Sequence, residues 1–163
     1  MKKTAVFAAA ALVCGLLAFI LIPSGTPAPA FSLPDLHGKT VSDAALRGKV
    51  TFINFWFPSC PGCVSEMPKI VKMSHDYRNR DGFQILAVAE PYDPLESVKT
   101  YAAERGMDFT VVYDADKAAA RAFGTAVYPT SFLVDKEGRV LKTFVGEPDF
   151  AELYRLIDGE MAE

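Results

Sequence analysis

The sequence predicts one α/β domain in which helices cover both faces of a mixed β-sheet. Two apolar runs, VTFINFWF at 50–57 and FQILAVA at 83–89, are typical of strands buried on both faces. Between them, apolar residues recur at helical spacing from Met67 to Tyr77. A strand, a helix and a second strand in this order form a βαβ unit. The length of 163 residues fits a single domain.

The other elements follow from the same periodicities and from turn residues. Gly106 and Gly124 mark two helix ends, and Asp116 is the expected N-cap of the second helix. The expected elements are a hairpin of strands 31–33 and 39–41, a helix at 95–105, a strand at 110–113, a helix at 117–123, strands at 131–134 and 140–145 around a turn at 135–138, and a last helix with the apolar stripe Phe150, Leu153, Tyr154, Ile157 and Met161.

An uncharged apolar segment, residues 4–22, follows Lys2 and Lys3 at the N-terminus. A helix of this length spans about 28 Å, close to the ~30 Å of a bilayer core. We therefore expect residues 1–22 to be a membrane anchor, with the basic end in the cytoplasm and the remainder exported. Ala28-Pro29-Ala30 resembles a signal-peptide cleavage site, so a cleaved signal is the alternative. Residues 23–30 would form a stiff Pro-rich linker before a domain at 31–163.

The charge balance gives no indication of nucleic-acid binding. The whole chain has a net charge of −3. Without Lys2 and Lys3, 15 basic and 20 acidic side chains remain, a net charge of −5. Nucleic-acid-binding domains usually carry a basic stripe, so we expect no nucleic-acid partner.

The motif CPGC at 60–63 lies where the first long strand ends and its helix begins. The free N–H groups and partial positive charge of a helix N-terminus favour a thiolate at Cys60. Cys63 lies one turn further on and can close a disulfide with it. Cys60 is thus the expected exposed nucleophile and Cys63 the sheltered resolving thiol. Pro61 has no N–H, and residues 57–66 contain no Lys or Arg, so we expect only moderate stabilisation of the thiolate.

A structural disulfide or half of a metal site are the alternatives for this motif. Zinc would need two further ligands, and the exported part contains only His37 and His75 as histidines. Neither belongs to a second paired motif, and we expect one in a turn and the other on a helix surface. The position after a buried strand favours redox chemistry that needs neither a metal nor another cofactor.

Several motifs appear in a fixed order along residues 28–160. They are FSLPD at 31–35, GK at 48–49, NFW at 54–56, CPGC at 60–63, EMP at 66–68, YPT at 128–130, FLVD at 132–135 and Gly138. In order and spacing they resemble thioredoxin-like proteins of the TlpA/ResA type. This family includes the CcmG/DsbE branch, which serves cytochrome c maturation. The resemblance implies a thioredoxin-like fold with an N-terminal hairpin and a βα insertion.

The resemblance also implies a function. Relatives of this type are bacterial, membrane-tethered thiol–disulfide oxidoreductases that act in the periplasm or at the cell exterior. Most of them reduce the disulfides of particular proteins and receive electrons from a membrane thiol donor. Apocytochrome c, a copper-site protein and its chaperone are the substrates that this implies.

The resemblance assigns roles to residues around the cysteines. Pro129 corresponds to a cis-proline that faces the active site and leaves the backbone of Tyr128 free to pair with a substrate segment. Glu66 corresponds to a glutamate that tunes the thiols or exchanges a proton with Cys63; a solvated first-turn acid is the alternative. The residues expected to contact substrate are Trp56, Ser59, Pro61, Gly62, Tyr128 and Thr130.

Two positions differ from related proteins. The family usually has Trp before the first cysteine, whereas Ser59 stands here and leaves the surface beside Cys60 open. Ordinary thioredoxins have a buried Asp at the position of Asn54. An amide cannot accept a proton, so that role falls to Glu66 or, as a weaker candidate, to Glu90.

Two further functions could use the same cysteine pair. A disulfide oxidant or isomerase differs from a reductase only in reduction potential, which depends on small differences in thiolate stabilisation. A copper(I) carrier would bind the metal through both thiolates. Thioredoxin-like copper chaperones tend to add a late histidine, and none follows His75.

Overall fold

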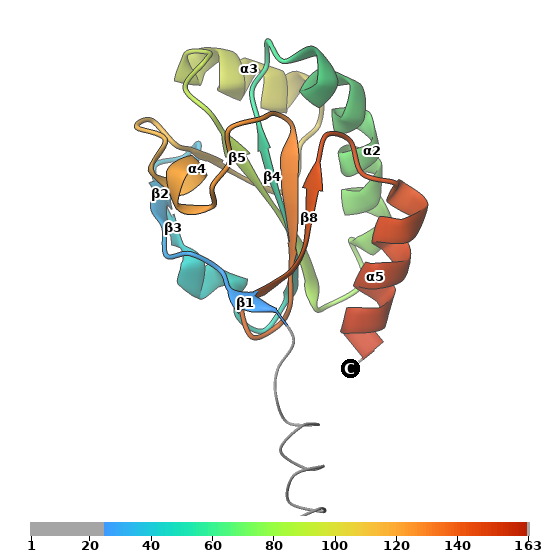
Figure 1. Ribbon diagram of the computed structural model, residues 1–163. Coiled ribbons are helices and arrows are strands. Elements are labelled where there is room, and N and C mark those ends of the chain that lie inside the picture. Colours follow the sequence, from blue (N-terminus) through green and yellow to red (C-terminus); the bar gives the residue numbers. More distant parts are fainter. Residues whose placement is uncertain (1–24, 163) are drawn as a thin grey trace, which may run out of the picture.

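The computed structural model describes residues 25–162, which fold around a six-stranded sheet of order β1-β8-β7-β4-β5-β6 (Figure 1). Its strands are β1 (Thr26–Pro27), β4 (Val50–Trp56), β5 (Phe83–Ala89), β6 (Thr110–Tyr113), β7 (Thr130–Val134) and β8 (Arg139–Val145). The helices are α2 (Pro61–Tyr77), α3 (Leu95–Glu104), α4 (Ala118–Ala122) and α5 (Phe150–Ala162), with a short 3₁₀ helix η1 (Asp43–Leu46) and a hairpin of β2 (Ser32–Pro34) and β3 (Thr40–Ser42).

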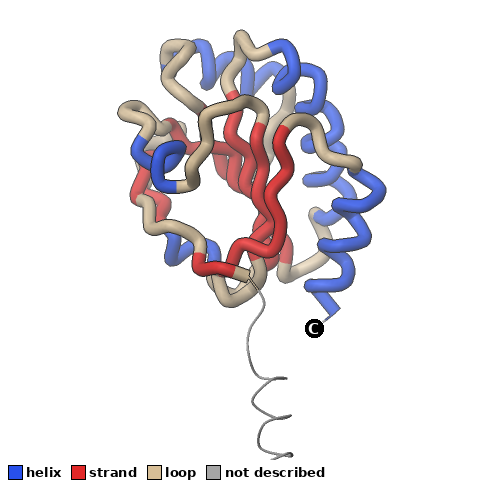
Figure 2. Tube along the Cα trace, viewed as in Figure 1, coloured by secondary structure: helices blue, strands red, loops and turns tan. Residues whose placement is uncertain are grey.

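The sheet is mixed, as the sequence predicts. β4 pairs in parallel with β5, and β5 with β6, whereas β7 is antiparallel to both β4 and β8. Trp56 lies opposite Ala89, and Phe55 lies opposite Thr130. The carboxyl ends of β4 and β5 therefore meet the start of β7 at one end of the sheet, drawn at the top of Figure 2.

Strand β4 divides its side chains between two apolar cores. Phe52 and Trp56 belong to the core beneath α2, α3 and α5, while Ile53 and Phe55 belong to the core beneath the hairpin and α4. All seven residues of the strand are buried, which explains its uninterrupted apolar sequence. Each large side chain buried in this way stabilises the fold by about 1.5–3 kcal/mol. Strand β4, which leads into the CPGC motif, is thus anchored on both faces.

The N-terminal hairpin is present, shifted by one residue from its predicted position. Leu33 pairs with Val41 across it. Asp35 closes its turn because Oδ1 accepts the backbone N–H groups of His37 and Lys39, each at 2.8 Å. An isolated bridge between Asp35 and Val112 joins the hairpin to β6. The hairpin therefore covers the second core, on the face opposite α2 and α5 (Figure 1).

Part of the segment expected to be a linker joins the sheet. Thr26 pairs with Val140 and Pro27 with Arg139 at the edge of β8. The predicted membrane segment, residues 1–22, lies outside the described residues. Within residues 25–162, no helix has both the length and the apolar character needed to cross a bilayer.

The predicted N-cap of α4 is wrong. Asp116 makes no capping bond, and the N-cap position is held by Lys117 at φ 56°. Asp114 provides the cap instead, because its two carboxylate oxygens accept the N–H groups of Ala118 at 2.8 Å and Ala120 at 2.9 Å. The turn between β6 and α4 folds back far enough for an earlier carboxylate to reach the helix end.

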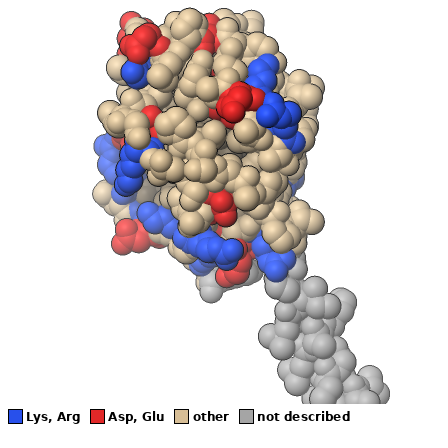
Figure 3. All heavy atoms as spheres, turned by 90° about the vertical axis from the view of Figure 1, so that its left-hand side faces the viewer, with Lys and Arg blue, Asp and Glu red and all other residues tan. Residues whose placement is uncertain are grey.

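Charged groups of both signs share the face that carries the hairpin and α4. Figure 3 shows Lys and Arg along the left and lower parts and at the upper right of this face, with Asp and Glu among them and uncharged atoms over much of the surface. This face therefore has no field of a single sign.

Candidate active site

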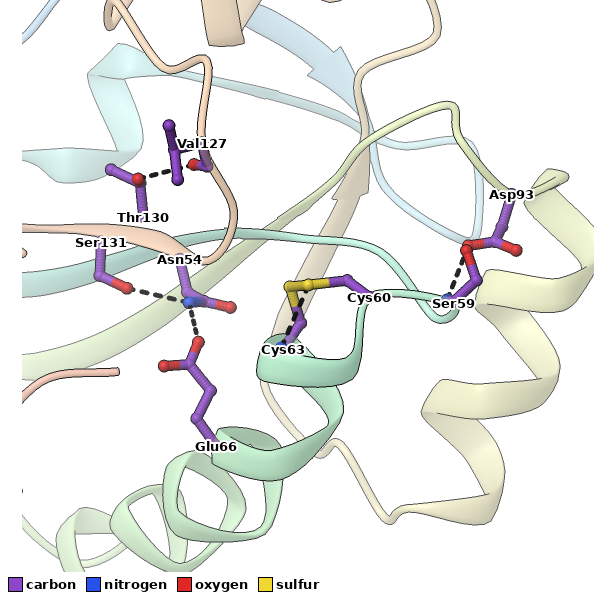
Figure 4. Close-up of a disulfide and its surroundings, with 9 residues drawn as sticks. All are labelled: Asn54, Ser59, Cys60, Cys63, Glu66, Asp93, Val127, Thr130 and Ser131. Carbon is purple, nitrogen blue, oxygen red and sulfur yellow. Dashed lines mark hydrogen bonds between the residues drawn. A yellow bond between two sulfur atoms is a disulfide. The ribbon is translucent and has the colours of Figure 1, made fainter. Parts of the chain in front are cut away.

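The two cysteines form a disulfide at the start of α2 (Figure 4), which confirms the predicted pairing. Their Cα atoms are 5.2 Å apart. Cys60 is the N-cap of the helix, and its Sγ accepts the N–H of Cys63 at 3.2 Å. Cys60 is 5% exposed and Cys63 is fully buried. The expected order of exposure is correct, but an open Cys60 is not, because both residues pack into the core beneath α2.

The start of α2 gives the Cys60 sulfur the partial positive charge of a helix end, but residues 57–66 add no cationic side chain. Pro61 occupies the first position of the helix, where its missing N–H costs no helical bond. Within residues 25–162, the N–H of Cys63 is the hydrogen-bond donor found on this sulfur. An acidic side chain lies beside the preceding residue, since Asp93 Oδ2 accepts the N–H of Ser59 at 2.8 Å. These contacts fit the expectation of moderate stabilisation.

Pro129 lies across from the CPGC turn. The bond between Tyr128 and Pro129 is cis, as the resemblance implies. A Cβ placed on Gly62 would lie 3.1 Å from Pro129 Cδ, so a larger residue at position 62 would press against the proline. The carbonyl of Pro129 accepts the N–H of Gly146 at 2.8 Å, which holds this loop against the end of β8.

Glu66 is a buried acid beneath the disulfide, one turn along α2 from Cys63. Its side chain is 0% exposed, which excludes the solvated alternative. Asn54 donates a 2.7 Å hydrogen bond to Glu66 Oε1 and a second, at 2.9 Å, to Ser131 Oγ (Figure 4). Burial raises the pKa of Glu66 to about 7, against the opposing effect of the Asn54 hydrogen bond. A carboxyl with this pKa can hold or release a proton near neutral pH.

Glu90 is a second buried acid at the same end of the sheet. It follows β5 directly, is 0% exposed, and accepts the hydroxyl of Tyr128 on Oε2 at 3.0 Å. Burial raises its pKa to about 7, the Tyr128 hydrogen bond lowers it, and Asp114 and Lys117 act in opposite directions. The structure therefore gives Glu90 more weight than the sequence does, because it links the carboxyl end of β5 to the residue before Pro129.

The residues expected to contact substrate separate into two groups. Ser59, Pro61 and Gly62 are exposed beside the cysteines, and Tyr128 is half-buried. A direct contact of Trp56 with substrate is contradicted in this state, and Thr130 has only a small exposed surface. Trp56 is 0% exposed and packs against Tyr101 at 5.2 Å between ring centroids. Thr130 is 4% exposed, and its hydroxyl donates to the carbonyl of Val127 at 2.7 Å.

The loop after β5 was missed by reasoning from sequence. Tyr92 packs on Phe57 at 4.5 Å between ring centroids, and Asp93 holds the N–H of Ser59. The signal available was topological: in parallel strands the carboxyl ends lie side by side, so residues after β5 must lie near residues after β4. This loop forms part of the wall around Cys60.

Potential metal ligands do not gather in the part of the chain that the structure describes. Among residues 25–162, no group of three or more His, Cys, Asp or Glu side chains is arranged to hold a metal ion. His37 and His75 are both exposed, one in the hairpin turn and the other on α2.

A redox cysteine pair at a helix start, with a cis-proline opposite and a thioredoxin-like sheet beneath, defines a thiol–disulfide oxidoreductase. The chain belongs to the Redoxin family, whose model matches residues 23–157. Two curated relatives are thiol-disulfide oxidoreductases ResA. The protein of Bacillus anthracis is 34% identical over 76% of this chain and 70% of its own. The protein of Geobacillus thermodenitrificans is 37% identical over 75% of this chain and 69% of its own.

Solved structures show the same fold. A solution structure from Neisseria meningitidis, described as a thioredoxin, is 65% identical with a TM-score of 0.78 and covers 86% of this chain and 93% of that one. A thiol:disulfide interchange protein DsbE from Chlorobium tepidum is 30% identical with a TM-score of 0.76, over 85% and 98% of the two chains. These similarities confirm the resemblance to thioredoxin-like oxidoreductases of the TlpA/ResA type.

Proposed function

We propose that the protein reduces disulfides of other polypeptides on the outer side of a bacterial cytoplasmic membrane. The observation that carries this proposal is the Cys60–Cys63 pair at the start of α2, with Cys60 capping the helix. The Cys60 thiolate attacks a substrate sulfur, the first substrate thiolate leaves and takes a proton, and a mixed disulfide remains. Cys63 then attacks Cys60 Sγ and releases the second thiol. The substrate gains two electrons, and the protein ends in the disulfide state of Figure 4.

The proton chemistry of the second step falls to Glu66 in this proposal. Cys63 must lose its proton to attack Cys60, and it is fully buried. Glu66 follows one helical turn later and is itself buried, with a pKa of about 7. A group with this pKa accepts the thiol proton near neutral pH without remaining permanently charged. The hydrogen bond from Asn54 keeps the carboxyl in its place.

The direction of exchange is supported by the charges around the pair. Residues 57–66 contain no Lys or Arg, and the carboxylate of Asp93 is bonded to the N–H of Ser59. The buried acids Glu66 and Glu90 lie at the same end of the sheet. Acidic groups withhold stabilisation from a thiolate, and a less stable thiolate makes the dithiol a better electron donor.

Measurement of the reduction potential tests the direction. We expect a value nearer to the thioredoxin value of about −270 mV than to the DsbA value of about −120 mV. Equilibration with glutathione buffers, followed by thiol labelling, gives this potential. A potential above about −180 mV, the level of protein disulfide isomerase, would make the protein an oxidant or isomerase instead.

The proposal also includes a membrane location. Residues 1–22 would anchor the chain, and the domain would face the periplasm or cell exterior beside a membrane thiol donor. The support is the uncharged run at 4–22 after Lys2 and Lys3. Extraction of the full-length protein should require detergent. A mature N-terminus at Phe31 would instead indicate a cleaved signal and a free periplasmic protein.

The substrates that we propose are apocytochrome c or a copper-site protein. The support is the similarity to relatives of the ResA and DsbE type. Cys63→Ser should accumulate these substrates as mixed disulfides on Cys60, since the resolving thiol is absent. Cys60→Ser is the matched control and should capture none. Equal capture by both variants would contradict the division into nucleophile and resolving thiol.

A further inference from the structure

Three aromatic rings from three different loops meet beside Cys60. Phe57 follows β4, Tyr92 follows β5, and Tyr128 precedes Pro129. Their ring centroids are 4.5 Å apart for Phe57 and Tyr92, 5.5 Å for Phe57 and Tyr128, and 5.6 Å for Tyr92 and Tyr128. Every ring thus touches the other two at distances typical of favourable aromatic pairs. We call this cluster the aromatic triad.

The aromatic triad is joined to both halves of the exchange centre. The carbonyl of Phe57 accepts the N–H of Cys60 at 3.1 Å. Tyr128 forms the cis bond with Pro129, which in turn approaches Gly62. A polypeptide whose disulfide reaches Cys60 must therefore pass next to the triad.

Exposed apolar side chains gather at this end of the molecule. Within residues 25–162, the large apolar side chains that remain exposed are Tyr92 at 52%, Val127 at 58% and Val145 at 70%. Val127 precedes Tyr128, and Val145 pairs with Thr130 at the start of β7. Apolar surface that stays in water next to a reacting group is typical of a binding surface.

Tyr92 is held in position by the bonds of its neighbour Asp93 and by a contact with Lys117. Asp93 bonds to the N–H of Ser59 at 2.8 Å, and its carbonyl accepts the hydroxyl of Tyr113 at 3.1 Å. Lys117 Nζ lies 3.6 Å from the centroid of the Tyr92 ring. A side chain fixed in this way loses little conformational entropy when a partner binds, so its contact area contributes more fully to affinity.

Building on the proposed reductase function, we propose that Tyr92 is a specificity-determining residue that binds an apolar side chain next to the substrate cysteine. The occupant is an extended segment of a disulfide-bearing polypeptide, since only such a segment can bring a sulfur to Cys60 and lie along the exposed ring. Ser59 leaves the surface in front of Cys60 without a large side chain. Tyr92, in the loop after the neighbouring strand β5, supplies a large apolar contact in its place.

Two peptide substrates test the proposal. Each is a symmetric pair of short peptides joined by one disulfide, identical in length and charge, with Phe or Ser beside the cysteine. Cys60 breaks the disulfide and releases one peptide thiol, and Cys63 releases the other as the protein becomes oxidised. The fully reduced wild-type protein should reduce the Phe peptide roughly 3- to 10-fold faster than the Ser peptide, the range of one aromatic contact.

Variants at position 92 identify the residue responsible. Tyr92→Ser and Tyr92→Gln should both lose the preference for the Phe peptide, while Tyr92→Phe should keep it. Tyr154→Gln is the matched control, because Tyr154 bonds to Asp76 near the far end of α2, about 24 Å along the helix from Cys60. This variant should keep the preference.

The possible outcomes separate this proposal from the proposed function. Equal rates for the two peptides with wild-type protein would overturn the role of Tyr92, and so would a preference that survives in Tyr92→Ser or Tyr92→Gln. Glutathione disulfide, which has no apolar side chain, tests exchange alone with the wild-type protein. Failure to reduce glutathione disulfide and both peptides would count against the proposed function itself.

Discussion

The side-chain amide of Asn54 donates one hydrogen bond to Glu66 at 2.7 Å and another to Ser131 at 2.9 Å, beneath the disulfide (Figure 4). One amide therefore joins β4, α2 and β7 at the point where they support the cysteine pair. It also fixes the position of an acid that is 0% exposed. Because burial outweighs the hydrogen bond, the pKa of Glu66 rises to about 7.

Stability should depend on pH through Glu66. The unfolded chain loses this proton near pH 4.5, whereas the folded protein keeps it up to about pH 7. The folded state is therefore favoured at low pH, and that contribution is lost as the pH rises from 4.5 to about 7. Glu66→Gln still accepts from Asn54 but cannot ionise. As the pH rises through this window, the wild type should lose up to about 3 kcal/mol more of its unfolding free energy than Glu66→Gln does.

Urea unfolding at the two ends of this window measures the difference. Glu152→Gln serves as the control, because this carboxyl is partly exposed on α5 and pairs with Lys142 at 2.5 Å. It should follow the wild-type pH dependence. If Glu66→Gln also follows the wild type, then Glu66 does not carry a proton at neutral pH in the folded protein.

Cys60 should be the faster thiol in reduced protein. It is the more exposed of the two cysteines, and its sulfur receives the N–H of Cys63 at the helix start. A brief iodoacetamide pulse at neutral pH followed by peptide mapping should find the label on Cys60 before Cys63. Faster labelling of Cys63 would reverse the roles given to the two residues.

Removal of the α4 cap should destabilise the fold. Asp114→Ala loses two hydrogen bonds to the helix start and should lower the unfolding free energy by about 1–2 kcal/mol. Asp116→Ala is the control from the same turn, since its side chain is exposed and provides no cap. Thermal unfolding of both variants gives the comparison, and an equal loss in both would contradict capping by Asp114.

Gly62 should tolerate alanine less well than a free helical glycine. A Cβ at Gly62 meets Pro129 Cδ at 3.1 Å, whereas a Cβ at Gly159 in α5 meets nothing within 4 Å. Gly159→Ala should raise stability by about 0.5–1 kcal/mol through helix propensity. Gly62→Ala should lack this gain and should also slow disulfide exchange. If urea unfolding shows the same gain in unfolding free energy for Gly62→Ala and Gly159→Ala, then the Pro129 loop accommodates the added Cβ without loss of stability.

Most elements could be predicted because their signals are local. The strand Thr110–Tyr113 has the predicted bounds, and α3 ends one residue before its predicted end. The cap of α4 could not be predicted by choosing the acidic residue directly before the helix. Asp114 rather than Asp116 reaches the helix start, because the backbone at Lys117 adopts a left-handed conformation that turns the chain back.

The candidate site shows the same division. The disulfide and the cis bond before Pro129 could be predicted from motifs that lie close together in sequence. The assignment of Trp56 as a substrate contact failed. Trp56 lies on the face of β4 that α2 and α3 cover, and only the packed structure shows that these helices leave none of its ring exposed.

The sequence by itself determined the order of strands β2 to β8 and of the α-helices, the place of the cysteine pair and the class of chemistry, because periodicity and motif spacing act over a few residues. Only the tertiary structure decided what surrounds the pair. The parallel register of β4 and β5 brings Tyr92 and Asp93 beside Cys60. The packing of α2 on β4 buries Glu66 against Asn54 and thereby raises the pKa of Glu66 to about 7. Both effects depend on contacts between segments distant in the chain, which no local pattern contains.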